Sequence, residues 1–336
     1  MKERIGYFDA IRGLAMLLVV VGHVFYFSFA DPESLFFKVL SSELEIPLLF
    51  MVSGFLIKVP EQSTWRYLGK KGFLLCIPAA IFMTAYVWVT GGSQSVAWFD
   101  SSKDGYWFTF SLFQFIALFT GITLLVRTAR LNRTVTNLLL LIASVIILFG
   151  SLWCVRCAES YPLFSLLGLA KFKWFIYFVF GSIIAERGIL TKEISDKEVK
   201  WGGVILAVCL LQHLYTYKGG GINSIGSLNL WLMLCTLTAL IVVLMGFRRY
   251  TSWSESRIGH ILQSIGRYSL DVYFIHYFFL PRNLQMVGEW FRVNSNPILE
   301  FAAALAIAAA VIAASLLVGR LIRLNPTLAR WLLAAK

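Results

Sequence analysis

The sequence has few charged residues for its length, and acidic residues are scarcer than basic ones. Charged residues make up 14% of the 336 residues, whereas a soluble globular domain has about 25%. Apolar residues reach 58%, and 18 Asp and Glu stand against 30 Lys and Arg. This composition excludes a soluble enzyme carried on a single anchor and indicates a polytopic membrane protein.

The motifs of several common soluble chemistries are missing. The sequence contains no Walker loop, serine elbow, zinc-ligand spacing or dinucleotide glycine fingerprint in the context that each requires. The five cysteines lie mostly in apolar runs, and Cys154 and Cys157 form a C-x-x-C without a second pair, which is a weak metal signal. We therefore predict no metal site, and we expect any chemistry to lie within a helical bundle.

Long apolar stretches recur along the whole chain. A membrane-spanning helix needs about 20 mostly apolar residues. Ten candidate stretches occupy residues 8–29, 44–59, 72–90, 106–126, 135–155, 164–186, 202–217, 228–247, 267–288 and 298–321. The sixth contains two lysines, so a start near Trp174 is an alternative for it. The predicted fold is all-α: a polytopic transmembrane bundle of about ten spanning helices that forms one domain over residues 1–336.

The basic residues cluster in alternate loops of this arrangement. An even number of spans places both termini on one side, and most Lys and Arg fall at the termini and near 58–71, 127–134, 187–201 and 248–267. The positive-inside rule then makes both termini cytoplasmic. The net charge of +12 therefore indicates topology and contact with anionic membrane lipids, not nucleic acid. We expect a multi-pass protein of the inner (cytoplasmic) membrane, with the oligomeric state left open.

The first apolar stretch carries three ionisable residues: Asp9, Arg12 and His23. A charged group at the bilayer centre costs at least about 2.5–3.5 kcal/mol, so such residues are functional candidates by default. Arg12 and His23 are separated by about three helical turns, roughly 16 Å, and therefore project from one face. Asp9 precedes Arg12 by three residues, a spacing that allows an ion pair.

Two interpretations of this face are open. His23 is a natural general base near neutral pH, and Arg12 is a natural partner for phosphate. A phosphate-bearing substrate held at the inner rim, with its reactive end near His23, would use both residues. Alternatively, Asp9 and Arg12 only fix the orientation of the helix, and His23 bonds to a neighbouring helix.

Further polar residues lie at membrane depth in other stretches. Glu45 is expected near the depth of His23, where it could orient the imidazole or lie among lipid headgroups. Asp271 and His276 are expected to face the bundle interior, and His276 is a rival catalytic candidate. Ser53 lies beside Gly54, a small pair that packing alone would explain.

Four short motifs follow one another in a recognisable order. They are Phe8–Ala15 followed by Gly22-His23, Phe50–Leu56, Tyr106–Phe108 and Ile265–His276. Through these motifs the chain resembles the membrane-bound acyltransferase-3 family, and the likeness covers nearly its whole length. The first motif, an arginine with ten residues before a histidine, resembles the first-helix signature of that family.

The resemblance implies transfer of an acyl group, usually acetyl from acetyl-CoA, to a hydroxyl of an extracytoplasmic glycan or lipid-linked sugar. It makes His23 the catalytic histidine and Arg12 the motif cation, with Asp9 beside it. Lys70 and Lys71 stand where the family often has arginines before its third helix. The residues expected to bind acyl-CoA are therefore Arg12, Asp9, Lys70 and Lys71. The expected donor substrate is acetyl-CoA, and no metal is expected.

The resemblance leaves the mechanism open. His23 either removes the proton of the acceptor hydroxyl or is itself acylated and relays the group outward. Ser53 or Tyr273 could donate a hydrogen bond to the tetrahedral intermediate. Two other functions remain alternatives: a transporter or flippase of a lipid-linked sugar with buried His, Asp and Arg as a proton relay, and an inactive protein that binds CoA without turnover.

Overall fold

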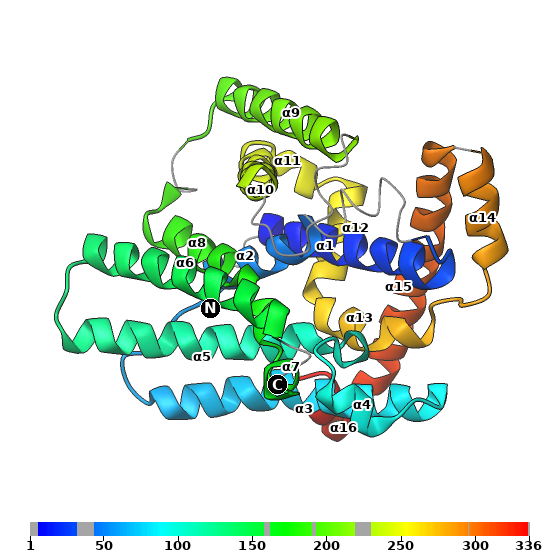
Figure 1. The fold of residues 1–336 in the computed structure, drawn as a ribbon, viewed down its shortest axis with the longest axis horizontal. Helices are drawn as coiled ribbons and strands as arrows, with labels where there is room; N and C mark the ends of the chain where they lie inside the picture. Colours follow the sequence, from blue (N-terminus) through cyan, green and yellow to red (C-terminus); the bar gives the residue numbers. More distant parts are fainter. Residues whose placement is uncertain are drawn as a thin grey trace. The chain divides into compact units, whose positions relative to one another are not determined.

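The computed structural model describes residues 6–31, 44–157, 162–189, 193–218, 230–294 and 296–334. Every regular element in these ranges is helical (Figure 1), which confirms the all-α class. The chain forms two compact units: unit 1 comprises Met1–Val52 and Gly188–Val318, and unit 2 comprises Ser53–Arg187 and Gly319–Lys336. Two of the three boundaries fall within helices α2 (Ile46–Leu56) and α15 (Pro297–Arg323), and the third follows the end of α8 (Phe175–Glu186).

Five helices in the described ranges are long and apolar enough to cross a membrane. They are Gly6–Ser28, Thr64–Thr90, Trp107–Thr128, Arg133–Cys154 and Pro297–Arg323. Each coincides with a predicted stretch, so the chain is a multi-pass membrane protein by length and composition. The total of about ten spans and the cytoplasmic side of both termini stay predictions.

The sixth predicted span is interrupted near its start. It begins with the short helix α7 (Pro162–Leu166), continues as the 3-10 turn η4 (Leu169–Trp174), and becomes the α-helix α8 only at Phe175–Glu186. Gly168 joins the first two pieces with a φ of 62°, a left-handed conformation that glycine adopts without steric cost. The alternative start near Trp174 is therefore confirmed, and a continuous helix over 164–186 is wrong.

The ninth predicted span, 267–288, is also not one helix. Helix α12 (Arg257–Arg267) gives way to α13 (Ser269–Ile275), the 3-10 turn η6 (His276–Phe278) and, after a non-helical stretch, α14 (Gln285–Asn294). Pro281 lies in the non-helical stretch. It lacks an amide hydrogen and disfavours helix at the residue before it, so the apolar run alone overestimated the length of this helix.

In unit 1, helix α1 (Gly6–His23) packs along α12 and continues into the π-helical turn η1 (Val24–Ser28). Two glycines allow the close approach. A Cβ at Gly13 would lie 1.9 Å from the carbonyl oxygen of Leu262, and one at Gly266 would lie 1.8 Å from that of Asp9. Both glycines belong to the sequence motifs, and their role in the structure is to let the backbones of α1 and α12 come into contact.

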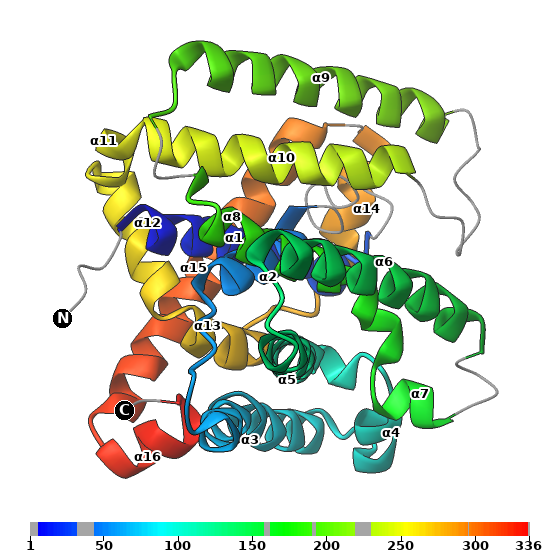
Figure 2. The same ribbon diagram turned by 90° about the vertical axis from the view of Figure 1, so that its left-hand side faces the viewer.

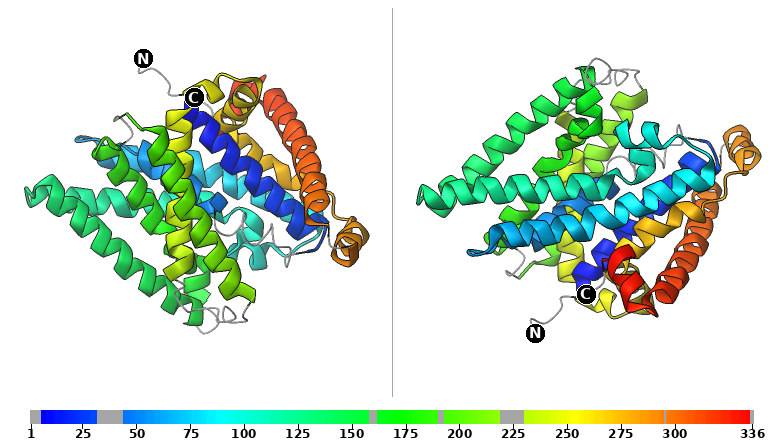
Figure 3. Two further views of the ribbon diagram at one scale, coloured as in Figure 1. Left: turned by 90° about the horizontal axis from the view of Figure 1, so that it is seen from above. Right: turned by 90° about the horizontal axis from the view of Figure 1, so that it is seen from below.

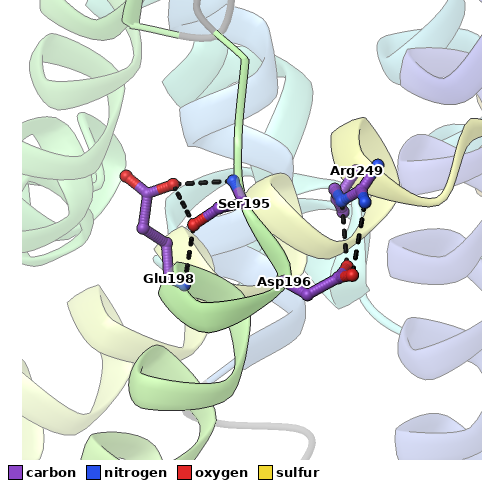
Figure 4. A network of polar contacts seen from close by, with 4 residues as sticks. All are labelled: Ser195, Asp196, Glu198 and Arg249. Atoms are coloured by element: carbon purple, nitrogen blue, oxygen red, sulfur yellow. Dashed lines mark hydrogen bonds and ion pairs between the residues drawn. The ribbon is translucent and has the colours of Figure 1, made fainter.

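Helices α9 (Asp196–Lys218) and α10 (Leu230–Arg249) run side by side in unit 1 (Figure 2). The start of α9 is a capping box. Glu198 accepts hydrogen bonds from the amide and hydroxyl of Ser195 at 2.7 and 2.8 Å, and its own amide donates to the Ser195 hydroxyl at 3.3 Å. Arg249, at the end of α10, donates to Asp196 (Figure 4). These contacts fix how α9 begins beside α10.

In unit 2, helices α3 (Thr64–Thr90) and α5 (Trp107–Thr128) lie side by side (Figure 3), and α6 (Arg133–Cys157) packs on α8. A Cβ at Gly54 would lie 1.9 Å from the carbonyl oxygen of Phe178, so α2 and α8 also meet at a small residue. The connection between α3 and α5 contains the short helix α4 (Gln94–Phe99) and the 3-10 turn η3 (Lys103–Gly105).

Candidate functional site

Two histidines from opposite ends of the chain are hydrogen-bonded in unit 1. Nδ1 of His23, the last residue of α1, lies 2.8 Å from Nε2 of His276, the first residue of η6. The planes of the two rings differ by 2°, with centroids 5.1 Å apart, so the hydrogen bond lies in the plane of both imidazoles. His276 is fully buried, whereas His23 is partly exposed. The exposed member of the pair is therefore the one that a ligand can reach.

The hydrogen bonds determine which ring nitrogen of each neutral histidine carries a proton. Nδ1 of His276 lies 2.8 Å from the carbonyl oxygen of Val272. A carbonyl only accepts, so this nitrogen carries the hydrogen and Nε2 of the neutral ring accepts. Nδ1 of His23 must then be the donor to His276. The remaining nitrogen, Nε2 of His23, is left with a lone pair.

That lone pair points to a third residue. The hydroxyl of Tyr277 lies 3.2 Å from Nε2 of His23, and in this arrangement the hydroxyl donates. The four groups thus form a directed chain from the Tyr277 hydroxyl through His23 and His276 to the Val272 carbonyl. Sequence reasoning did not select Tyr277. Its only signal was a phenol next to a histidine in an apolar run, and many tyrosines in membrane proteins fit that description.

Arg12 contacts the same C-terminal segment as His23. Its Nη2 donates to the hydroxyl of Ser269 at 3.1 Å, and Ser269 is the first residue of α13, which leads directly into His276. Asp9 is buried, with 6% of its surface exposed. The structure therefore brings the first-helix motif and the C-terminal motif together at two points. Arg12 contacts Ser269 at the start of α13, and His23 contacts His276 directly after its end.

The remaining candidates of unit 1 are Tyr273, Asp271 and Glu45, and all three are buried. The Tyr273 ring centroid lies 6.4 Å from that of His276, and Asp271 is 2% exposed. The predicted interior positions of Asp271 and His276 are thus confirmed. Glu45 is also buried, immediately before α2.

Three candidates belong to unit 2. Ser53 lies in α2, and Lys70 and Lys71 lie in α3. Lys70 is exposed, whereas Nζ of Lys71 lies 5.7 Å from the centroid of the Tyr67 ring. Their grouping with Arg12 around one ligand stays a prediction.

The chemistry available at the histidine pair is that of a base or nucleophile. A neutral imidazole whose donor side is held by a second imidazole presents its lone pair in a fixed direction, as general bases and nucleophilic histidines require. The non-catalytic interpretation, in which His23 only bonds to a neighbouring helical segment, is also compatible with the hydrogen bond between His23 and His276. Within the described ranges no group of three or more His, Cys, Asp or Glu could hold a metal ion.

Comparison with known proteins gave one match. Residues 5–320 match the model of a protein family described as an acyltransferase domain. No curated protein and no solved structure matches the chain. The matched segment contains every residue of the hydrogen-bonded chain, from His23 to Tyr277.

Proposed function

Because the chain belongs to the acyltransferase-3 family and is a membrane acyltransferase, we propose that it transfers an acyl group, preferentially acetyl, from cytoplasmic acyl-CoA to a hydroxyl of an extracytoplasmic or lipid-linked glycan. One observation carries the proposal. The chain Tyr277–His23–His276–Val272 leaves Nε2 of His23, a partly exposed residue, without a proton. Acyl transfer to a hydroxyl needs a group of this kind to take the hydroxyl proton.

In the proposed reaction the acceptor hydroxyl replaces Tyr277 as the donor to Nε2 of His23. The acceptor oxygen attacks the thioester carbonyl while its proton moves to Nε2, so no free alkoxide forms. The tetrahedral intermediate then collapses, the C–S bond breaks, and the CoA thiolate takes the proton from His23. General-base help of this kind is typically worth about 10²–10⁴-fold in rate.

His276 supports this proton transfer from behind. When Nε2 of His23 gains a proton, the ring becomes a cation whose Nδ1–H donates to His276. A hydrogen bond from a charged donor is stronger than one between neutral groups, so the contact gains strength as the reaction proceeds. The same lone pair would serve the other mechanism, in which His23 attacks the thioester, releases CoA and carries the acyl group to the acceptor.

The phosphates of CoA need cations, which the proposal assigns to Arg12, Lys70 and Lys71. The guanidinium of Arg12 presents five N–H donors in a planar fork that suits phosphate oxygens, and its Nη2 donates to the Ser269 hydroxyl. Membership of an acyltransferase family favours this function over a transporter or flippase. Buried histidines also occur in proton relays, but such a relay does not require a donor substrate.

The proposal is tested by replacing His23. Membrane vesicles that contain the full-length protein are supplied with acetyl-labelled acetyl-CoA, and label in membrane glycans and release of CoA thiol are measured together. His23→Ala is expected to lower transfer by about 10²-fold or more, while a cooperative thermal unfolding transition with a measurable midpoint (Tm) in detergent shows that the variant is folded. His260→Ala is the matched control because His260 is an exposed histidine of α12. Full transfer by His23→Ala would contradict the proposal.

A further inference from the structure

The connection between α3 and α5, residues 91–106, contains an unusual run of backbone conformations. Lys103, Asp104 and Gly105 have φ values of 46°, 48° and 94°. Only glycine adopts positive φ without steric cost, and two consecutive non-glycine residues in this region are uncommon. Such strain persists only where the surroundings enforce it, and it collects at functional sites.

The side chain of Lys103 supplies that enforcement. It is 6% exposed, and Nζ donates to the carbonyl oxygens of Trp98 at 3.0 Å, Asp100 at 3.4 Å and Leu166 at 2.9 Å. An ammonium group has three donors, so each one is used. Burial lowers the pKa of Lys103, and the negative charge of Asp100 partly offsets this. The lysine thereby fixes this connection to the segment before η4.

A cavity of about 220 Å³ lies at this fixed point. Trp98, Trp107 and Phe110 supply aromatic walls, and Ser111 and Gln114 supply polar groups. Nε2 of Gln114 donates to the carbonyl oxygen of Leu167 at 2.8 Å, which orients the amide. An apolar cavity with a few oriented polar groups is the usual form of a small-molecule site.

The Trp107 wall is itself held in place. Its indole stacks on that of Trp174 with centroids 5.0 Å apart and planes 19° apart. Nζ of Lys171 lies 4.8 Å from the centroid of Trp107, and Nζ of Lys173 lies 4.6 Å from that of Trp174. Cation–π contacts and stacking both order these rings. The cavity is therefore preorganised, which reduces the entropy lost when a ligand binds.

We propose that this cavity binds one pyranose ring of a glycan. A pyranose presents an apolar C–H face that can pack on an indole, together with hydroxyls that can bond to an amide or a serine hydroxyl. The volume is below the roughly 300–1,000 Å³ of sites for drug-sized ligands, as a single ring requires. An acyl chain would pack on the aromatic walls but would form no hydrogen bonds with the polar groups that Gln114 and Ser111 present to the cavity.

That the sugar bound here belongs to the acceptor glycan rests on the proposed function. Sugar binding itself does not, because it can be measured without acyl-CoA. The two proposals therefore fail in different experiments: the proposed function fails if wild-type protein neither consumes acetyl-CoA nor transfers acetyl, and the sugar site fails in the binding experiment below.

The binding experiment uses the full-length protein in nanodiscs, because sugar-based detergents would occupy the site. The ligands are the methyl glycosides of glucose, galactose, N-acetylglucosamine and glucuronic acid, and saturation-transfer NMR measures the Kd of each. At least one glycoside should bind saturably. Trp98→Ala and Gln114→Leu should each weaken that binding about tenfold or more. Trp88→Ala is the matched control, since Trp88 is an 81% exposed tryptophan of α3.

The outcomes separate cleanly. Trp98→Phe retains an aromatic wall and should retain part of the affinity, which guards against a Trp98→Ala variant that fails to fold. Four results would overturn the proposal: no binding of any glycoside to wild-type protein, equal binding by the Trp98 and Gln114 variants, equal loss in Trp88→Ala, or displacement of the bound glycoside by pantetheine.

Discussion

His276 and Lys103 are both buried basic side chains, yet the structure uses them differently. His276 donates to one carbonyl and has its second nitrogen in a hydrogen bond with His23. Lys103 donates to three carbonyls, which match its three hydrogens. The hydrogen bonds of His276 favour one tautomer of its partly exposed neighbour His23. Those of Lys103 go only to backbone carbonyls.

This difference distinguishes a reactive site from a structural clamp. A buried polar group needs hydrogen-bond partners in either case, because an unsatisfied one costs about 1–3 kcal/mol. A group whose partners are all carbonyls fixes backbone positions and does nothing more. A group whose chain of partners ends at an accessible lone pair can act on a substrate. Burial of a basic residue alone therefore does not indicate catalysis.

The largest effect that tests this comparison is expected at His276. His276→Leu removes the acceptor for Nδ1–H of His23, so His23 loses the preference for the tautomer with a lone pair on Nε2. Loss of the correct tautomer in a hydrogen-bonded catalytic histidine is costly, and we expect kcat for acetyl transfer to fall by roughly 10²-fold. KM for acetyl-CoA should stay unchanged, since His276 acts through His23 as a positioning residue.

His276→Gln supplies the conservative comparison. The Gln amide oxygen can accept from His23 near the position of the lost imidazole nitrogen, so this variant should recover a large part of kcat. A purely structural role for His276 predicts the opposite ranking, in which activity follows Tm in detergent and not the presence of an acceptor. Equal kcat in the Leu and Gln variants would remove His276 from the mechanism.

The next largest effect is expected at Lys103. Lys103→Met keeps the length and apolar stem of the side chain but leaves the carbonyls of Trp98, Asp100 and Leu166 without the ammonium. We expect a loss of about 1–3 kcal/mol, seen as a Tm lowered by several degrees in detergent. Because two of these residues, Trp98 and Leu166, also line the cavity, binding of the methyl glycosides should weaken as well.

Lys197→Met is the control for this substitution, because Lys197 is exposed in α9 and surface changes usually stay within about 0.5 kcal/mol. If Lys103→Met and Lys197→Met unfold at the same temperature as the wild type, then the three carbonyl contacts do not stabilise the connection. The contrast with His276 would then disappear.

The sequence pointed to the ionisable residues of the first helix but not to Lys103. Asp9, Arg12 and His23 stood out because ionisable residues are expensive in an apolar helix; in the structure Asp9 is buried, and Arg12 and His23 contact the C-terminal motif. Lys103 gave no such signal. It lies in a run of Ser, Lys, Asp and Gly that is typical of a solvated turn, and one of its acceptors, Leu166, is 63 residues away.

The break in the stretch 267–288 was missed for a related reason. Apolar content measures whether a segment can be buried, and it does not determine whether the segment stays helical. Pro281 and the change of conformation at Tyr268, with φ −108° and ψ 23°, divide the stretch into short pieces. This division places His276 and Tyr277 in a 3-10 turn beside His23, an arrangement that no helical-wheel argument over 22 residues would produce.

The smallest effect is expected where a charged pair is exposed, and it completes the comparison. Asp196 and Arg249 are 42–50% exposed and form an ion pair of 2.9 Å, and such surface pairs contribute little. Hydrogen bonds from Arg249 and Tyr250 lower the pKa of Asp196 below its usual value of 3.8. A carboxyl with a lowered pKa stabilises the folded state above its ordinary pKa, and this contribution is lost as the pH falls through the folded value.

Asp196→Asn should therefore lower Tm slightly at pH 7, less than Lys103→Met does, and the difference from wild type should vanish in strong acid and shrink in high salt. Glu255→Gln, which replaces another exposed carboxyl, is the control and should change the stability by no more than about 0.5 kcal/mol. A Tm loss for Asp196→Asn as large as that for Lys103→Met would mean that burial does not make the contacts of Lys103 more stabilising than the ion pair of Arg249. The remaining difference between Lys103 and Arg249 would then be that Lys103 donates to three carbonyls and Arg249 to one carboxylate.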